Sequence, residues 1–326
     1  MPQISVIIPV HNTAPYLRRC IDSVRDQTLK NIEIILVENL SSDDSPLICD
    51  EYARLDSRIK VLHLTVAGPS VARNAGVEIA LAPFIGFVDS DDHIEATMYE
   101  DLLNALSHYQ ADMIYCNFCY EYENGTNKQL YPNSGKVFSF SAKEVVFSIL
   151  LDEVSSSPCT KLFKKELFYT LKFPEGVFFE DHSTVYRWAA MCNKILWFDN
   201  VYYYYLQREG STCHSLDLKK QYDFFLAEYE RLRFIKNDAL FDDCERKRLI
   251  STVVRNCLWI FKMFMQRPNH NKYKAEIRGM RQKLYQCLSF TEEEIERRDY
   301  IRLRKIGYFW PIYYLTHFYK KKKDES

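Results

Sequence analysis

Short apolar runs alternate with longer amphipathic stretches over the first hundred residues of the chain. Four of these runs are rich in β-branched residues and almost unbroken by polar positions, which is typical of strands buried in a parallel sheet. The stretches between them are long enough for crossover helices. The pattern therefore predicts an α/β fold, with a mostly parallel sheet flanked by helices. The expected strands span residues 4–10, 32–37, 59–64 and 84–88, and the expected helices span residues 16–27, 45–55 and 69–80.

The pattern changes in the second part of the chain. From about residue 216 it becomes strongly helical, with aromatic and aliphatic residues on one stripe at helical spacing. We therefore expect an α/β domain over residues 1–215 and a helical C-terminal region over residues 216–326, with a boundary near Ser215. Before that boundary, further helices are expected at 97–109, 141–151 and 164–170, and further strands at 113–120 and 197–205.

Composition places the chain among globular proteins. Its 326 residues are 47% hydrophobic and 15% aromatic, which is enough to bury a sizeable core. The net charge is −1, so nothing global attracts nucleic acid, and no nucleic-acid partner is expected. The first apolar stretch has no basic region before it and is interrupted by Pro9, so a secretory signal is not expected. Together with ten cysteines in no regular framework, this predicts a cytoplasmic location and reduced, packed thiols.

The C-terminal stretch is the one local candidate for a membrane surface. Residues 306–319 are aromatic and are followed by four lysines, Lys320 to Lys323. The stretch is too short, and too interrupted by Pro311, to span a bilayer. Aromatic rings beside lysines suit contact with an anionic membrane, at roughly 1 kcal/mol for each cation. Peripheral contact with the inner face of the plasma membrane is one reading, and a helix packed on the domain with a solvated lysine tail is the other.

Three carboxylates follow the fourth apolar run: Asp89, Asp91 and Asp92. Mg²⁺ and Mn²⁺ prefer oxygen ligands and usually take only one or two protein carboxylates, leaving positions for water and substrate phosphates. In open α/β sheets, ligands bind outside the carboxyl ends of the strands. The cluster therefore predicts a divalent-cation site that serves an anionic diphosphate. The alternative is an acidic turn that caps the helix beginning near Glu95.

Four motifs occur in one order along the chain, and together they resemble glycosyltransferase family 2. The resemblance covers roughly residues 4–215. The motifs are SVIIPVHN at 5–12, VENLSSD at 37–43, GPSVARNAG at 68–76 and the aspartate cluster at 89–92, and the resemblance extends through KLF at 161–163, FED at 179–181 and REGS at 208–211.

This resemblance implies a GT-A (Rossmann-like) fold and the transfer of one sugar, with inversion, from a nucleotide-diphospho-sugar. A UDP-sugar is the expected donor, with Mg²⁺ or Mn²⁺ as cofactor. The expected acceptor is a saccharide, lipid-linked at the cytoplasmic membrane face, in surface polysaccharide or lipopolysaccharide biosynthesis. The enzyme could act as a homodimer.

The resemblance also assigns roles to individual residues. Asp91 and Asp92 would hold the metal, and Asp89 would support the site or reach the ribose. Arg73 offers a planar fork of donors to the base or diphosphate, although an ordinary surface arginine is the alternative. The other residues expected at the nucleotide sugar are Pro9, His11, Asn12, Glu38 and Asn39, together with Arg208 and Ser211 on a loop that could close over the diphosphate or be an ordinary turn.

The resemblance implies Asp181 as the general base, with Glu180 as its neighbour. An acceptor hydroxyl must lose its proton as it attacks, so a carboxylate is required on the opposite face of the sugar. Two aromatics precede this pair and a helix follows, so desolvation could raise the pKa of a carboxylate here toward neutrality. The alternative is an N-terminal helix cap.

One segment departs from the family pattern. The family usually carries two aspartates and a glycine where this chain has Glu38, Asn39 and Leu40. Asn39 can still accept a hydrogen bond through its carbonyl oxygen, but it also brings donors, which leaves the base of the donor open and could reduce activity. The departure suggests a non-catalytic nucleotide-sugar-binding subunit as an alternative. A sugar nucleotidyltransferase is a further one, but it predicts a glycine-rich, basic loop after the first strand, which residues 9–16 lack.

Overall fold

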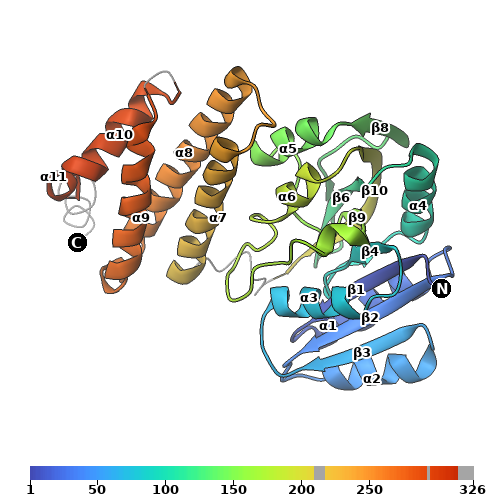
Figure 1. The fold of residues 1–326 in the computed structure, drawn as a ribbon. Helices are drawn as coiled ribbons and strands as arrows, with labels where there is room; N and C mark the ends of the chain where they lie inside the picture. The colour runs from blue at the N-terminus through green and yellow to red at the C-terminus, as the bar shows by residue number, and fades with distance from the viewer. Residues whose placement is uncertain (209–216, 292–293, 315–326) are drawn as a thin grey trace. The chain divides into compact units, whose positions relative to one another are not determined.

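The computed structural model describes residues 1–208, 217–291 and 294–314, and the chain divides into two compact units (Figure 1). The boundary expected near Ser215 lies outside the described residues. The α/β unit comprises Met1–Val146, Ser156–Gly176 and Thr184–Ser211, and the helical unit comprises Phe147–Ser155, Val177–Ser183 and Thr212–Ser326.

The α/β unit begins with four parallel strands joined by three helices. Their order in the sheet is β3-β2-β1-β4, so the direction of winding reverses between β1 and β4. Helix α1 packs against α2, whereas α3 packs against β1 and β2. Such a reversal is the switch point at which open α/β sheets bind their ligands. The elements are β1 (Ile4–Val10), α1 (Ala14–Arg25), β2 (Ile32–Asn39), α2 (Ser45–Leu55), β3 (Ile59–Leu64), α3 (Pro69–Ile79) and β4 (Phe84–Phe87).

Six further strands complete the sheet, in the order β4-β9-β6-β10-β5 with β7 paired to β6 and β8 to β10. Strand β9 is antiparallel to both β4 and β6, and β6 is parallel to β10. Hence β1, β2, β4, β6 and β10 all end at the same edge. The elements are β5 (His93–Ile94), α4 (Met98–Tyr109), β6 (Met113–Tyr122), β7 (Asn127–Gln129), β8 (Lys136–Phe140), α5 (Ala142–Leu150), β9 (Lys161–Lys164), the 3-10 helix η1 (Lys165–Phe168), α6 (Val185–Ala190) and β10 (Ile195–Gln207).

One close contact sets how α3 lies on the sheet. A Cβ atom added at Gly76 would stand 2.5 Å from Cγ2 of Ile7 on β1, so only glycine lets the helix approach this closely. The contact holds the first half of α3, which carries Arg73, close to the strand that ends at the switch point.

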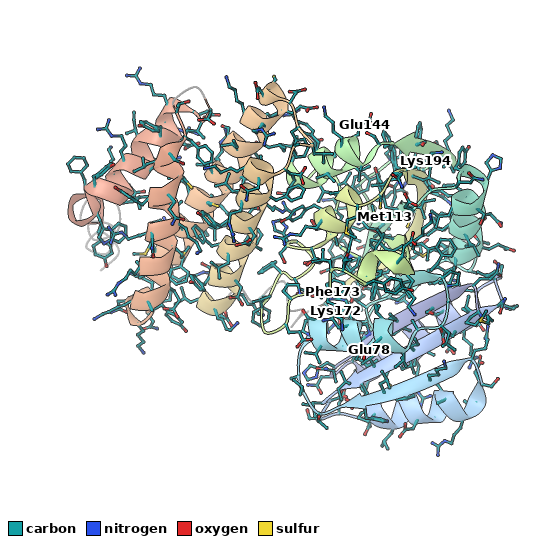
Figure 2. The ribbon with its side chains drawn as sticks, viewed as in Figure 1. Glu78, Met113, Glu144, Lys172, Phe173 and Lys194 are labelled. Carbon is teal, nitrogen blue, oxygen red and sulfur yellow. The ribbon has the colours of Figure 1, made fainter. Side chains whose placement is uncertain are left out.

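An aromatic cluster forms the core beneath β4 and β9. Trp188 is fully buried, and its ring centroid lies 4.8 Å from Phe173 and 4.6 Å from Phe168. Phe87 on β4 meets the edge of Phe173, which is labelled in Figure 2. The prediction of a helix over residues 164–170 is wrong in part, because Lys164 is the last residue of strand β9 and only Lys165–Phe168 are helical, as the single 3-10 turn η1. The strand places Leu162 and the neighbouring apolar side chains in the core.

The helical unit is built on α7 and α8, which pack against each other. Asp217 caps α7 by accepting a hydrogen bond from the backbone of Lys220, and Asp242 with Glu245 forms a capping box at the start of α8. Much of the predicted apolar stripe on α7 is buried. The elements are α7 (Leu218–Asn237), α8 (Asp243–Gln266), η2 (His270–Lys272), α9 (Lys274–Gln286), η3 (Cys287–Ser289), α10 (Arg297–Tyr308) and α11 (Trp310–Tyr314).

The described residues contain nine cysteines, all free thiols and eight of them buried, as the sequence predicts. Among the described helices, none has the combination of length and apolar character that crossing a bilayer requires. The lysines Lys320 to Lys323 lie outside the described residues, so membrane contact through this tail stays a prediction.

Candidate active site

The acidic turn that follows β4 is tied to β10 through Asp92. This side chain is only 2% exposed, and both of its oxygens accept hydrogen bonds. Oδ1 accepts from the backbone N–H of Leu206 at 2.8 Å, and Oδ2 accepts from the hydroxyl of Tyr203 at 2.5 Å. The same hydroxyl accepts from the backbone N–H of Asp89 at 3.1 Å. Asp92 therefore holds the turn in place, with both of its oxygens already engaged.

The electrostatics of this turn favour a cation. Burial raises the pKa of Asp92 well above its usual range, and the charges of Asp89 and Asp91 raise it further. Burial and the charge of Asp89 also raise the pKa of Asp91, against the opposing effect of its hydrogen bond with Arg208. Carboxylates whose ionised forms are disfavoured in this way are stabilised by added positive charge. The residues present therefore fit a hard divalent cation, which prefers oxygen ligands.

Two arginines bind the more accessible carboxylates of the turn. Nη2 of Arg73 donates to Oδ1 of Asp89 at 3.0 Å, and Nε of Arg208 donates to Oδ2 of Asp91 at 2.8 Å. The Arg208 guanidinium also lies 5.2 Å from the ring centroid of Tyr16. The side chains of Asp89 and Asp91 are 39% and 20% exposed. Asp89 and Asp91 are thus the pair that a ligand can reach.

The first half of α3 explains the GPSVARNAG motif. Gly68 precedes the helix with φ of 140°, a conformation that favours glycine. Asn74 exchanges two hydrogen bonds with the backbone of Phe173, at 2.9 and 3.0 Å, and the Phe173 ring centroid lies 5.5 Å from the guanidinium of Arg73. Arg73 is 7% exposed. It is therefore a fixed, buried arginine, and the alternative of a surface arginine is wrong.

The loops after β1 and β2 are joined by side-chain hydrogen bonds. Nδ1 of His11 donates to the backbone oxygen of Asn39 at 2.7 Å, and Nε2 then accepts from the amide of Asn12 at 3.3 Å. Asn12 has a left-handed φ of 51°, and its side-chain oxygen accepts from the backbone of Ser42 at 2.7 Å. These bonds place His11 and Asn12 beside the end of β2, one strand away from the acidic turn.

The segment that departs from the family pattern has a structural role in this chain. Oδ1 of Asn39 accepts from the backbone of Gly68 at 2.8 Å, and its amide donates to the backbone oxygen of Val66 at 3.2 Å. An aspartate could make only the first bond, because an ionised carboxylate cannot donate. Glu38 accepts from the backbone of Ser41 at 2.6 Å, and Leu40 has a left-handed φ of 56° where the family usually has glycine. Asn39 thus connects β2 to the loop that leads into α3.

Glu180 and Asp181 belong to the helical unit. Asp181 is half-buried, and its Oδ1 accepts from the backbone of His182 at 2.7 Å. Glu180 is 8% exposed. The N-cap of the next helix, α6, is Thr184. The alternative that Asp181 caps this helix is therefore wrong.

The structure thus brings most of the predicted residues to one edge of the α/β unit. Tyr203 was missed by sequence reasoning, because it lies in a run of four tyrosines at 202–205 in which the adjacent Tyr202 and Tyr203 are both buried, so no alternation marks it. Ser211 lies outside the described residues. The residues gathered at the carboxyl ends of β1, β2, β4 and β10 or on α3 are Pro9, His11, Asn12, Glu38, Asn39, Arg73, Asp89, Asp91, Asp92 and Arg208.

The model of the glycosyl transferase family 2 matches residues 5–172, which contain the four ordered motifs described above and the KLF segment at 161–163. The chain belongs to glycosyltransferase family 2. This family 2 enzyme transfers sugars. It is similar to the glycosyltransferase GlyG of Streptococcus pneumoniae, with 33% identity over 223 residues, 65% of this chain and 73% of GlyG.

Solved structures confirm the GT-A fold of this family 2 glycosyltransferase. Residues 1–349 of S. aureus TarS in complex with UDP match it with a TM-score of 0.68 at 18% identity, over 95% of this chain and 91% of that one. The mannosyltransferase PcManGT from Pyrobaculum calidifontis, in complex with GDP-Man and Mn²⁺, matches with a TM-score of 0.55 at 15% identity, over 95% and 88% of the two chains. At these identities the likeness shows the fold alone.

Proposed function

We propose that this glycosyltransferase moves one sugar, with inversion, from a UDP-sugar to a hydroxyl of a saccharide acceptor. The observation that carries the proposal is the acidic turn at the switch point of the sheet, where Asp89 and Asp91 keep partly exposed carboxylates. TarS, which has the same fold, was solved with UDP, and PcManGT was solved with GDP-Man and Mn²⁺. These complexes support a nucleotide-sugar donor and a divalent cation for this chain as well.

Asp89 and Asp91 would hold Mg²⁺ or Mn²⁺, and Asp92 would support them. This assignment differs from the prediction of Asp91 and Asp92 as ligands, because both oxygens of Asp92 accept hydrogen bonds from β10. The bound ion would neutralise charge on the departing diphosphate. Arg73 and Arg208 carry guanidinium donors that suit phosphate oxygens, and both already contact the acidic turn.

Asp181 is the proposed general base. It accepts the proton of the acceptor hydroxyl while that oxygen attacks the anomeric carbon and the bond to the diphosphate breaks. Attack opposite the leaving group inverts the anomeric configuration. One oxygen of Asp181 is bonded to the backbone of His182, and the other has no partner among the described residues. The proton acceptor is thus oriented by its own backbone turn.

The proposed acceptor is a lipid-linked saccharide of surface polysaccharide or lipopolysaccharide biosynthesis, met at the inner face of the plasma membrane. Helix α10 supports this location. It exposes Arg297, Arg304 and Lys305, for which no partner occurs among the described residues, and it ends with exposed Tyr308 followed by exposed Phe309. Cations together with aromatic rings suit the interface of an anionic membrane.

The structure weakens the argument for the alternative function, a non-catalytic nucleotide-sugar-binding subunit. It rests on the altered segment at Glu38, Asn39 and Leu40, and two of these residues make hydrogen bonds that build the loops beside the site. Membership in a family of sugar-transferring enzymes favours catalysis over both this alternative and sugar nucleotidyltransfer.

A donor panel tests the proposal. Purified protein is incubated with UDP-GlcNAc, UDP-glucose, UDP-galactose and GDP-mannose, with Mn²⁺ or EDTA, and released nucleoside diphosphate is measured. We expect Mn²⁺-dependent release from a UDP-sugar and loss of most of it in Asp181→Asn. Release that is equal in EDTA would contradict the metal assignment, and full turnover by Asp181→Asn would contradict the assigned base.

A further inference from the structure

The segment of residues 177–183, here called the base segment, is attached to helix α7. The backbone N–H of Phe178 donates to Oδ2 of Asp223 at 3.1 Å, and the ring centroid of Phe179 lies 4.6 Å from that of Phe224. Phe179 has a left-handed φ of 62°. Both contacts precede Asp181 in the chain, and all of these residues lie in the helical unit.

The residue that follows Asp181 is held more tightly. Nε2 of His182 lies 2.7 Å from Oε1 of Glu228, and Nδ1 lies 2.8 Å from Nη2 of Arg231. Nε of Arg231 also donates to the backbone oxygen of His182 at 3.1 Å. Glu228 and Arg231 lie on α7 and are fully buried. Thus His182 is fixed by its ring and by its backbone at once.

The chemistry of the partners determines the state of the His182 ring. A guanidinium has only donors, so Nδ1 of His182 must accept the hydrogen bond from Arg231. The proton of the neutral ring is therefore on Nε2, where it is donated to Glu228. The ionised carboxylate and the guanidinium balance each other, with Nη1 of Arg231 also 2.8 Å from Asp152. In a doubly protonated ring, the N–H at Nδ1 would face the N–H of Arg231, and this hydrogen bond would be lost.

A metal site is the other reading of this cluster. Asp152, His182 and Glu228 offer ligand atoms within 4.8 Å of one another. However, Arg231 donates to two of these three residues, and its guanidinium lies 3.6 Å from the third. The guanidinium already supplies the positive charge that a metal would bring, so the cluster is an ion-pair network.

We propose that His182, Glu228 and Arg231 are positioning residues, which act on the transfer reaction by holding the backbone that carries Asp181. This inference rests on the proposed function, since it gives the network its role through the assigned base. Asp181 lies between the contacts of Phe178 and Phe179 and the contacts of His182, while one of its own oxygens stays uncommitted. Helix α7 thereby becomes the support of the segment that carries the assigned base.

The first test measures hydrogen–deuterium exchange in the full-length protein. His182→Phe removes both side-chain hydrogen bonds but keeps a ring beside Phe224, and Arg231→Met removes the guanidinium. Asp299→Asn is the matched control, because Asp299 is a buried carboxylate of the same unit that pairs with Arg302 on α10. We expect the amides of 178–183 to exchange about 10-fold faster in the first two variants and unchanged in the control. Unchanged exchange in His182→Phe would overturn the proposal.

The second test separates positioning from general loss of structure. With the UDP-sugar that the donor panel identifies, His182→Phe should lower kcat about 10- to 100-fold, because small misplacement of a catalytic group is costly. The dissociation constant of UDP with Mn²⁺, measured by calorimetry, should stay within about 2-fold. In the Asp181→Asn background, His182→Phe should have no further effect on kcat, because the group that it positions is already lost.

The outcomes distinguish this inference from the proposed function. Full turnover by Asp181→Asn would refute the base itself. Loss of turnover in Asp181→Asn together with wild-type kcat in His182→Phe would refute only the positioning role. If Arg231→Met fails to fold, Arg231→Lys replaces it, since lysine keeps the charge but lacks the fork that reaches His182 and Asp152 together. A wild-type kcat in Arg231→Lys, with wild-type exchange of the base segment, would likewise overturn the proposal.

Discussion

The hydroxyl of Tyr203 donates a hydrogen bond of 2.5 Å to the buried carboxylate of Asp92, 111 residues away in the chain. It also accepts from the backbone of Asp89. One phenol on β10 therefore fixes both the first and the last aspartate of the acidic turn. The turn that we assign to the metal and the donor is thus shaped by a strand from the far side of the sheet.

Tyr203→Phe removes this hydroxyl without changing the ring. A hydrogen bond to a charged group contributes about 1.5–3 kcal/mol, so we expect the free energy of unfolding to fall by about 2 kcal/mol. Urea denaturation followed by circular dichroism measures the change. Tyr204→Phe is the matched control, because its hydroxyl bonds to the exposed Glu95 and should cost less than about 1 kcal/mol. If the free energy of unfolding fell equally in the two variants, the hydrogen bond to Asp92 would stabilise the protein no more than an exposed hydrogen bond does.

The raised pKa of Asp92 predicts how stability depends on pH in Asp92→Asn. The folded state binds the proton of Asp92 more tightly than the unfolded state does. The contribution of Asp92 to the free energy of unfolding of the wild-type protein therefore falls as pH rises above the ordinary pKa of an aspartate. In EDTA, the neutral amide should therefore raise the melting temperature relative to wild type at pH 7, and the gain should shrink as pH falls toward 4.

Asp112→Asn is the control with the opposite sign. Burial alone would raise the pKa of Asp112, but hydrogen bonds from Lys164 and from the backbone of Asn193 lower it overall. Ionised Asp112 therefore stabilises the folded protein at pH values above the ordinary pKa of an aspartate. This stabilisation is lost as pH falls below that pKa. We expect Asp112→Asn to melt below wild type at pH 7 and still at pH 4, and to approach wild type only as pH falls below the ordinary pKa of an aspartate. The same sign in both variants would contradict the electrostatic account of the acidic turn.

Leu40→Gly should stabilise the protein. A non-glycine residue in the left-handed region destabilises the folded state by roughly 1–2 kcal/mol. Glycine avoids this strain, but it loses more backbone entropy on folding, which offsets about 0.5–1 kcal/mol of the gain. Leu40 has φ of 56° and is 49% exposed, so its side chain contributes little packing. We expect a net gain of about 0.5–1 kcal/mol in urea denaturation. Leu40→Ala keeps the backbone strain and should show no gain; a gain equal to that of glycine would mean that the side chain is the cause.

Asn39→Asp restores the residue type common in the family and should nevertheless destabilise this chain. The new carboxylate oxygen would face the backbone oxygen of Val66, which now receives a hydrogen bond. Two hydrogen-bond acceptors would then face each other without a donor between them, which costs about 1–3 kcal/mol at pH 7. Asn31→Asp makes the same chemical change at an exposed position and should be near neutral. Urea denaturation decides, and an Asn39→Asp variant as stable as wild type would show that the loop tolerates the family residue.

The first half of the fold follows closely from the sequence because β1 and β2 are buried runs rich in β-branched residues. The predicted strand 59–64 and helix 45–55 match β3 and α2 residue by residue. Strand β9 was missed because it has only four residues and begins and ends with lysine. Strand β5, with two residues, offers no period to read.

The sequence predicts those site residues that lie in motifs. It does not predict roles that depend on contacts between residues far apart in the chain. The spacing of Asp89, Asp91 and Asp92 indicates a cation site, but only the hydrogen bonds from Tyr203 and Leu206 show that Asp92 is engaged by the protein. The ion pair of Glu228 and Arg231 with His182 joins residues about fifty positions apart, and local pattern carries no signal for it.

The most direct test of the central claim is calorimetry of UDP binding with Mn²⁺ and with EDTA, on wild type and on Asp91→Asn. The acidic turn is proposed to hold the cation that binds the diphosphate, so wild type should bind UDP at least about 10-fold more tightly with Mn²⁺ than with EDTA. In Asp91→Asn that difference should vanish. Equal UDP affinity with and without Mn²⁺ in wild type, or a full Mn²⁺ effect in Asp91→Asn, would contradict the account.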